Sequence, residues 1–245
     1  MSSFLGNFFQ VFLYQPLFNA LIFIYNLLPG HDLGIAVIIL TLLIKVLTLP
    51  LNVRAFKIQQ AMAKIQPQIK EVQDKHKGKP EEQAKAVSEI FKREKVSPFS
   101  SLVPILIQLP ILLALYQLFW RGLWLENNYL YSFIAKPEFL SPISLGILDL
   151  SKPSLLIALL AGLAQLFQSL TMPSSVNKSG DDVKDKMMRA MQKQTMFIFP
   201  LLTIFILVKL PSVLGLYWLV TSAFTVLQQY ILMKPNRKFP TGQKI

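Results

Sequence analysis

The sequence predicts an all-α membrane protein: five transmembrane helices, an outer interfacial helix and a cytoplasmic helical hairpin. Three observations lead to this fold class. The chain has 245 residues and is 53% hydrophobic. Several uninterrupted apolar runs approach the roughly 20 residues that cross a ~30 Å hydrocarbon core, and helices satisfy their own backbone groups in lipid whereas isolated strands do not. Basic residues gather in a few segments between these runs, as is typical of multi-pass membrane proteins.

The apolar runs and the charged segments give the expected boundaries. The expected spans are residues 33–51, 98–120, 154–173, 194–210 and 212–233. The remaining segments are an outer interfacial helix and turn (1–32), a cytoplasmic coiled-coil hairpin (52–97), an extracytoplasmic loop (121–153), a cytoplasmic loop (174–193) and a short basic cytoplasmic tail (234–245).

The N-terminal segment is the ambiguous one, because residues 8–29 are long enough for a sixth span. Against a span, Pro16 lies inside the run, and amide side chains interrupt it at Gln10, Gln15, Asn19 and Asn26. We interpret the segment as a helix lying in the outer interface, followed by a turn at 29–32. It has no basic n-region and no small-residue cleavage site, so we do not expect a cleaved signal peptide.

The first span is expected to continue as a helix towards Lys64 and then to become one arm of the hairpin. The apolar residues of this arm are spaced 4, 3, 4 and 3, the pattern of a coiled-coil seam: Ile58, Met62, Ile65, Ile69 and Val72. Gly78 and Pro80 mark the end of this arm and the start of the next. The second arm should pack through Ala84, Val87 and Phe91. Pro67 predicts a kink or restart in the first arm.

The positions of the basic residues predict the orientation in the membrane. Of the 25 Lys and Arg, 20 fall in the hairpin, the 174–193 loop and the tail, whereas four fall on the opposite side. By the positive-inside rule the hairpin, that loop and the C-terminus are cytoplasmic, and the protein belongs in the plasma membrane.

Lys45 is the remaining basic residue and the only charge in the run LGIAVIILTLLIKVLTLP, residues 33–50. A charge at membrane depth costs about 2.5–3.5 kcal/mol on insertion scales, so its presence indicates function. The structural alternative is that the side chain reaches an interface. Arg54 lies nine residues further along, about 13 Å at 1.5 Å per residue, which is far for one side chain.

Polar side chains in the expected spans are biased towards the cytoplasmic half. Those we assign to a groove around Lys45 are Thr41, Thr48, Gln108, Gln165, Gln168, Ser222, Thr225 and Gln228. Each alone is equally explained by hydrogen bonding between helices. Together with Lys45, and with no carboxylate in any expected span, they predict a water-accessible cavity that carries an unpaired cation.

Several function classes are excluded or disfavoured by composition. The chain has no Cys and only His31 and His76, so we expect no thiol chemistry, no metal site and no cofactor. The net charge of +12 lies in membrane-flanking segments, so we expect no nucleic acid partner. Intramembrane proteolysis lacks an acidic pair and a Ser–His arrangement at membrane depth. A small transporter or channel using Lys45 as an anion or substrate site is the main alternative, although the sequence shows no inverted repeat and no pair of broken helices.

Three stretches resemble a known family. They are TLPLNVRAFKIQQAMAKIQPQIKEVQ at the end of the first span, PILIQLPILLALYQLF in the second and LPSVLGLYWLVTSAFTVLQQYILM at the last. All three resemble the YidC-type membrane protein insertases, the YidC, oxidase-assembly and Albino insertase family. The resemblance runs in order from about Tyr14 to Met233.

The resemblance implies a five-span core whose hydrophilic groove opens to the cytoplasm and to lipid and is closed on the outside. It implies insertion and folding of integral membrane proteins without covalent chemistry. Nascent membrane proteins and membrane lipids would be the partners, and Tyr217 and Trp218 the client-contact candidates. A Sec translocon and the ribosome are further partners in the family, but the short tail predicts weaker ribosome docking here. The family usually has Arg five residues before the Pro of the first span, whereas this chain has Lys45 before Pro50. Lys keeps the charge but lacks the forked guanidinium.

Overall fold

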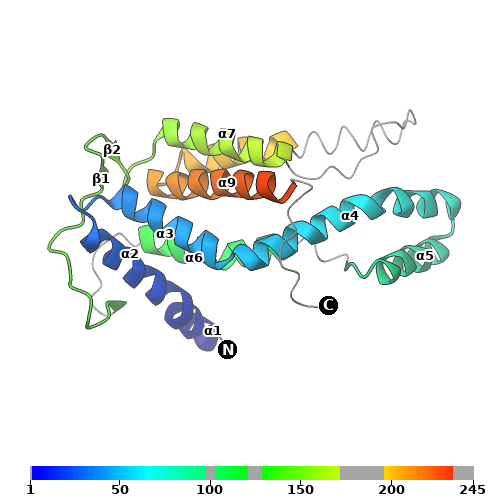
Figure 1. Ribbon diagram of the computed structural model, residues 1–245, viewed down its shortest axis with the longest axis horizontal. Helices are drawn as coiled ribbons and strands as arrows, with labels where there is room; N and C mark the ends of the chain where they lie inside the picture. Colours follow the sequence, from blue (N-terminus) through cyan, green and yellow to red (C-terminus); the bar gives the residue numbers. More distant parts are fainter. Residues whose placement is uncertain (1, 98–102, 121–128, 172–195, 234–245) are drawn as a thin grey trace.

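The computed structural model describes residues 2–97, 103–120, 129–171 and 196–233, and it is predominantly helical (Figure 1). The expected loop at 174–193 and the tail at 234–245 lie outside the described residues. The helices up to the hairpin are α1 (Ser2–Phe9), the π-helix η1 (Gln10–Tyr14), α2 (Gln15–Leu27), α3 (Leu33–Leu47), α4 (Leu49–Lys75) and α5 (Pro80–Arg93). They are followed by α6 (Val103–Trp120), strands β1 (Ile143–Ser144) and β2 (Leu148–Asp149), α7 (Leu155–Thr171), a helix at Met196–Leu207 and α9 (Ser212–Met233).

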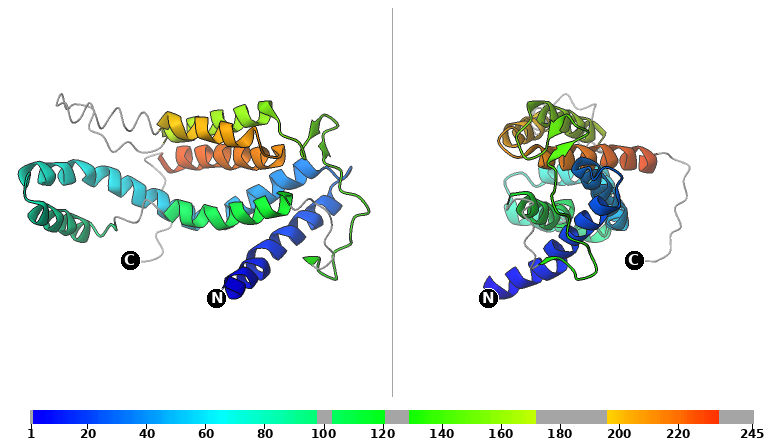
Figure 2. Two further views of the ribbon diagram at one scale, coloured as in Figure 1. Left: turned by 180° about the vertical axis from the view of Figure 1, so that it is seen from behind. Right: turned by 90° about the vertical axis from the view of Figure 1, so that its left-hand side faces the viewer.

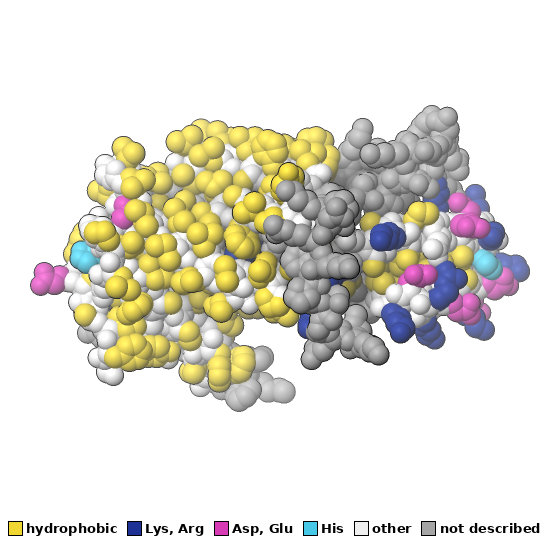
Figure 3. Space-filling model, in the orientation of Figure 1, with side chains coloured by type: hydrophobic (Ala, Val, Ile, Leu, Met, Phe, Trp, Pro, Cys, Tyr) yellow, Lys and Arg dark blue, Asp and Glu magenta, His cyan; other side chains and the backbone are white. Residues whose placement is uncertain are grey.

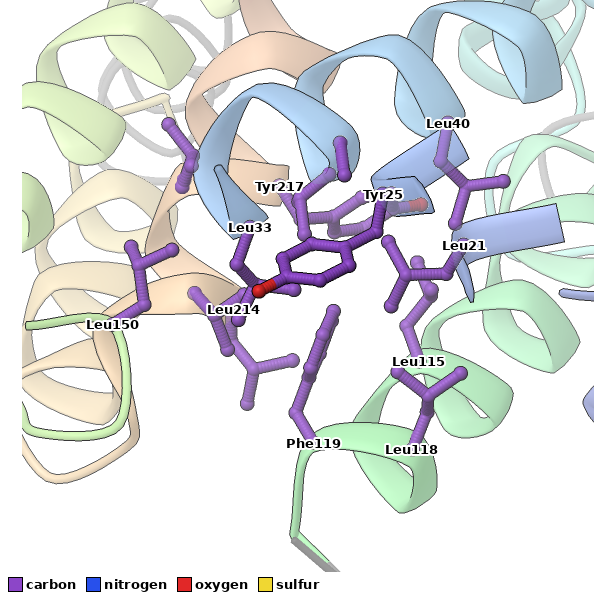
Figure 4. Close-up of a cluster of buried hydrophobic side chains, with 14 of the residues drawn as sticks. Leu21, Tyr25, Leu33, Leu40, Leu115, Leu118, Phe119, Leu150, Leu214 and Tyr217 are labelled. Carbon is purple, nitrogen blue, oxygen red and sulfur yellow. The ribbon is translucent and has the colours of Figure 1, made fainter. Parts of the chain in front are cut away.

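Helix α9 is central and packs against α7, α3 and α6 (Figures 1 and 2). The main hydrophobic core lies between α2, α3, α6 and α9, where Leu21, Leu33, Leu115 and Tyr217 are almost fully buried (Figure 4). Apolar side chains also cover the outside of this helical body, whereas charged side chains gather over α4 and α5 (Figure 3). This division of the surface is what a lipid-embedded body with a water-exposed appendage requires.

Length and composition alone identify few complete spans among the described residues. The helical stretch Gly6–Leu27, with 22 residues, is long and apolar enough to cross a membrane. This stretch includes most of residues 8–29, which we interpret as a helix in the outer interface. Its length is equally compatible with a sixth transmembrane span. Helices α3 and α4 pass the same test only as a bent pair, and Leu155–Thr171 and Met196–Leu207 are shorter apolar helices.

The chain continues in helical form from the first span past Lys64, as expected, but it is broken at Thr48, beside Pro50. Helices α3 and α4 meet at Thr48 and are bent by 62°. Pro50 lies in the first turn of α4, where its missing N–H is tolerated and its ring disfavours a straight continuation. Thr48 closes α3 by donating from its hydroxyl to the Ile44 carbonyl at 2.8 Å, and it accepts a hydrogen bond from the Asn52 amide at 3.1 Å.

Of the kink or restart expected at Pro67, the restart does not occur, since α4 runs from Leu49 to Lys75 without interruption. Pro67 has no N–H to donate to the carbonyl group four residues earlier in the helix. Pro67 lies on the exposed face of α4, where water can donate to that carbonyl instead.

Helices α4 and α5 pack through a small core of their own, with Ile65, Ile69 and Ile90 buried. The partly buried residues around it are Met62, Val72, Val87, Phe91 and Val96. Ile58 lies outside this cluster and Ala84 is exposed, because the contact begins one turn later than the sequence pattern suggests. Ile90, which the pattern did not single out, takes the central place on α5.

The amide side chains that interrupt the N-terminal apolar run have defined partners in the loop after α6. Asn19, only 2% exposed, donates to the Tyr129 carbonyl at 2.6 Å and accepts from the Tyr131 amide at 2.7 Å. Asn26 donates to the Ala135 carbonyl at 2.7 Å. Residues 129–135 therefore lie along α2. The Asn side chains of α2 are hydrogen-bonded to this segment and are not left without partners.

Close helix packing depends on Gly162 in α7. A Cβ atom at this position would lie 2.3 Å from Cγ1 of Ile204, on the helix Met196–Leu207. We expect Gly162→Ala to destabilise the protein by about 1–3 kcal/mol through overpacking. The measurement is thermal unfolding of the purified protein in detergent.

A second variant tests the cause of this loss. In Gly162→Ala/Ile204→Ala the clash is removed, so the double variant should unfold close to Ile204→Ala alone. Additive losses from the two substitutions would contradict the proposed contact.

Candidate functional site

Lys45 lies in the last turn of α3 and is 7% exposed. Its Nζ donates to Oγ1 of Thr225 on α9 at 3.4 Å, a long hydrogen bond. Thr225 in turn donates from its hydroxyl to the Thr221 carbonyl at 2.8 Å, so its lone pairs face the ammonium group. An ammonium group carries three donors, and this contact engages one of them.

The ammonium group borders a cavity of about 360 Å³. Its walls come from five helices. The lining residues are Lys45 (α3), Asn52, Ala55, Phe56 and Gln59 (α4), Gln108, Leu109 and Leu112 (α6), Gln165 and Gln168 (α7), and Trp218, Thr221, Ser222, Thr225, Gln228 and Gln229 (α9). Among the residues that the structure describes, this lining contains one cation, many neutral amides and hydroxyls, and no carboxylate. Such a site can hydrate a polar segment and attract negative charge.

Hydrogen bonds between helices shape this cavity. The Trp218 indole donates to Oε1 of Gln165 at 3.1 Å, which ties α9 to α7. The Thr171 hydroxyl donates to Oε1 of Gln229 and joins the same helices one level further along. Between α6 and α9, the Gln108 amide donates to the Tyr217 hydroxyl.

Most of the residues assigned to the groove from the sequence meet around the cavity. The structure brings together Lys45, Gln108, Gln165, Gln168, Trp218, Ser222, Thr225 and Gln228. Thr41 and Thr48 do not belong to the lining: Thr41 is buried and donates to the Val37 carbonyl of its own helix at 2.6 Å, and Thr48 donates to Ile44. Tyr217 is 1% exposed and packs into the core, so its ring is not available at the cavity surface.

Sequence reasoning missed the contribution of α4. Asn52, Ala55, Phe56 and Gln59 were assigned to the cytoplasmic hairpin, but the bend at Thr48 turns the first turns of α4 along the cavity. The available signal was Pro50, which marks a helix start as readily as a kink.

Comparisons with known proteins place the sequence in a family. The family described as 60Kd inner membrane protein matches residues 23–239. A protein named membrane protein insertase YidC from Geobacter sulfurreducens is 30% identical over 231 residues, covering 94% of this chain and 38% of that protein. One of the same name from Fusobacterium nucleatum is 30% identical over 226 residues, covering 91% of this chain and 98% of that protein.

A further protein of that name, from Methylorubrum extorquens, is 28% identical over 231 residues, covering 92% of this chain and 36% of that protein. The chain thus spans little more than a third of the length of the Geobacter and Methylorubrum relatives, but nearly all of the Fusobacterium one. The family match covers most of the chain, including every helix that lines the cavity. This chain is therefore a membrane protein of the 60Kd inner membrane protein family, which includes the proteins named membrane protein insertase YidC.

Proposed function

We propose that this chain is an insertase that helps integral membrane proteins to enter and fold in the bilayer, with the cavity around Lys45 as its groove. The proposal rests on one observation: Lys45 is a buried cation in a polar cavity, and none of the described residues that line this cavity is a carboxylate. A structural cation would have a fixed acidic partner, because an unpaired buried charge is costly. Here the partner arrives from outside as the acidic part of a client. The names of the relatives support the same function.

The mechanism needs no covalent step and no cofactor. Amides and hydroxyls from α6, α7 and α9 replace water around a short polar segment, which lowers the cost of carrying it part of the way through the bilayer. Lys45 attracts acidic residues of that segment. The membrane potential assists the outward transfer of negative charge by about 2.3 kcal/mol per charge per 100 mV. The apolar helix of the client is released because its burial in lipid is favourable.

The proposed arrangement in the membrane has five spans built on α3, α6, α7, Met196–Leu207 and α9, with the N-terminal helices in the outer interface. The α4–α5 hairpin and the C-terminus are cytoplasmic, as the distribution of basic residues favours. Since α4 supplies one wall of the cavity, this topology opens the groove towards the cytoplasm, where clients are made. Nascent membrane proteins and lipids are the proposed partners, and contact with a Sec translocon or a ribosome would occur at this cytoplasmic side.

The topology predicts a labelling pattern. The chain has no Cys, so single-Cys variants report one position each. Lys75→Cys, at the end of α4, should be protected from an impermeant thiol reagent in intact cells, and Lys136→Cys, in the loop after α6, should react. Both should react after lysis. Labelling of residue 75 in intact cells would overturn the topology.

Insertion itself is tested with purified protein in vesicles. A short client with an acidic N-terminal segment is added, and protection of that segment from external protease measures insertion. Vesicles with this protein should protect the segment, and matched vesicles without it should not. Equal protection in the two would overturn the insertase function.

The bend between α3 and α4 is one feature that also occurs in transporters, where broken helices form substrate sites. Transporters of that kind carry a second broken helix in the corresponding half. Among the described residues α3–α4 is the one such bent pair. A transporter would move small anions across client-free vesicles in a Lys45-dependent way, whereas the insertase should not.

A further inference from the structure

The loop before α7 carries an apolar tip that the insertase mechanism does not use. Strands β1 and β2 form an antiparallel hairpin in which Ile143 pairs with Asp149 and Ser144 with Leu148. Its large aliphatic side chains point outwards: Ile143 is 50% exposed, Leu145 71% and Ile147 87%. Residues 139–148, FLSPISLGIL, contain no charge. A loop that lies in water normally carries polar residues at its tip, so this composition indicates an apolar environment.

The tip is held rigidly against the start of α3. Asp32, the N-cap of α3, accepts from the Ser144 hydroxyl at 2.7 Å and from the Leu145 amide at 2.5 Å. A Cβ atom at Gly34 would lie 2.2 Å from the Ser144 hydroxyl oxygen, so the hairpin packs directly on the first turn of α3. Burial acts to raise the pKa of Asp32, but its hydrogen bonds, led by that from Leu145, lower it overall, so the carboxylate stays charged and keeps both bonds.

Backbone amides of the hairpin are already hydrogen-bonded within the protein, which favours an environment with little water. The amide of Leu145 is bonded to Asp32, that of Ile147 to the Ser144 carbonyl at 3.1 Å, and that of Leu150 to the Pro142 carbonyl at 2.8 Å. Donors that are already paired lose little on entering an apolar environment, whereas unpaired donors cost several kcal/mol each.

The base of the hairpin has the opposite character. Lys152 Nζ lies 2.8 Å from Asp149 Oδ2, and hydrogen bonds from Lys152 and Ser151 lower the pKa of Asp149 to about 2. Ser212 at the start of α9 donates to the Asp149 carbonyl at 3.0 Å, which fixes this charged base at the helix ends. The hairpin therefore has a charged end, at Asp149 and Lys152 where it joins the helices, and an aliphatic tip at Leu145 and Ile147.

We propose that the tip formed by Leu145 and Ile147 inserts into the lipid leaflet at the N-terminal ends of α3 and α9. This is the outer leaflet in the proposed topology. The placement follows from continuity with the lipid-exposed helices: Figure 1 shows the hairpin beside the first turns of α3, α7 and α9, and Leu155 and Leu156 of α7 are themselves 63% and 65% exposed. The two aliphatic side chains of the tip alone are too small a surface for a stable protein interface, which buries about 800 Å² per partner. Lipid is the occupant that needs no complementary shape.

This inference rests on the chain being embedded in a membrane, and not on its insertase activity. The experiment uses the full chain with a single Cys at Ile147→Cys or Leu145→Cys, each labelled with an environment-sensitive fluorophore. The matched control is Glu138→Cys, an exposed charged position in the same loop, five residues before Ile143. Each labelled protein is placed in phosphatidylcholine–phosphatidylglycerol vesicles with and without spin-labelled lipid, and thermal unfolding in detergent checks that all three fold alike.

Labels at 145 and 147 should show blue-shifted emission and quenching by spin-labelled lipid several-fold stronger than the label at 138. These signals should persist when the protein is diluted tenfold in lipid. Water-like emission with equal, weak quenching at all three positions would overturn the proposal. Loss of the blue shift on dilution would also overturn it, because the occupant would then be a second copy of the chain.

Discussion

Replacing Lys45 with glutamate is expected to reduce insertion of a client with an acidic translocated segment by at least about tenfold, whereas Lys45→Arg should retain it. Two opposite charges about 4 Å apart attract each other by about 4 kcal/mol at an effective dielectric constant near 20, and the substitution turns this attraction into repulsion. A tenfold loss corresponds to about 1.4 kcal/mol, so it is a conservative expectation. Lys45→Ala should fall between wild type and Lys45→Glu.

The measurement is protease protection of the client's outer segment in vesicles that carry each variant. A client whose acidic residues are replaced with Asn and Gln should respond weakly to all three substitutions. Lys57→Glu is the matched control, because Lys57 is exposed on α4 and lies outside the cavity lining. Equal activity of Lys45→Glu and wild type on the acidic client would show that the charge is incidental and that hydration of the groove alone accounts for function.

Lys45 could be singled out from the sequence because a lone charge in an apolar run has few explanations. The amides of α6, α7 and α9 could be added because they share its depth in the membrane. Thr41 and Thr48 are also polar residues in an apolar span, but their hydroxyls donate to backbone carbonyls of α3 and do not line the cavity. A buried threonine can bond to the carbonyl of its own helix four residues back, and the sequence does not say whether it does so or faces a cavity.

The wall formed by α4 could not be predicted, since it depends on the direction in which the chain turns after Thr48. Pro50 permits a bend without fixing its angle, and no local pattern shows that α4 meets α6 after the bend. The same limit applies to Asn19 and Asn26. Their polarity in the sequence indicates contact with the membrane–water interface. Their actual partners, the backbone groups of residues 129–135, lie more than 100 positions away in the sequence, and no local pattern indicates them.

The hairpin core gives the second large effect. Ile65→Asp/Ile69→Asp places two carboxylates in the small core between α4 and α5, where both isoleucines are buried. The substitution loses the burial of two aliphatic side chains, about 1.5–3 kcal/mol each, and adds the cost of burying charge without a partner. This core is too small to absorb such a loss, so α5 should separate from α4. Because the start of α4 also lines the cavity, insertion should fall strongly.

Exposed charges on the same hairpin provide the comparison. Lys75 pairs with Glu71 at 2.7 Å, but both side chains are about two-thirds exposed, and pairs that are exposed to solvent contribute little to stability. Lys75→Glu/Lys77→Glu should therefore change insertion only modestly. Limited proteolysis near Gly78 reports hairpin packing, and client protection reports function. If the surface variant abolishes insertion while the core variant retains it, the hairpin acts as an electrostatic receptor for clients or lipid headgroups. If only the core variant loses insertion, the hairpin is instead a packed support that holds the α4 wall of the groove in place.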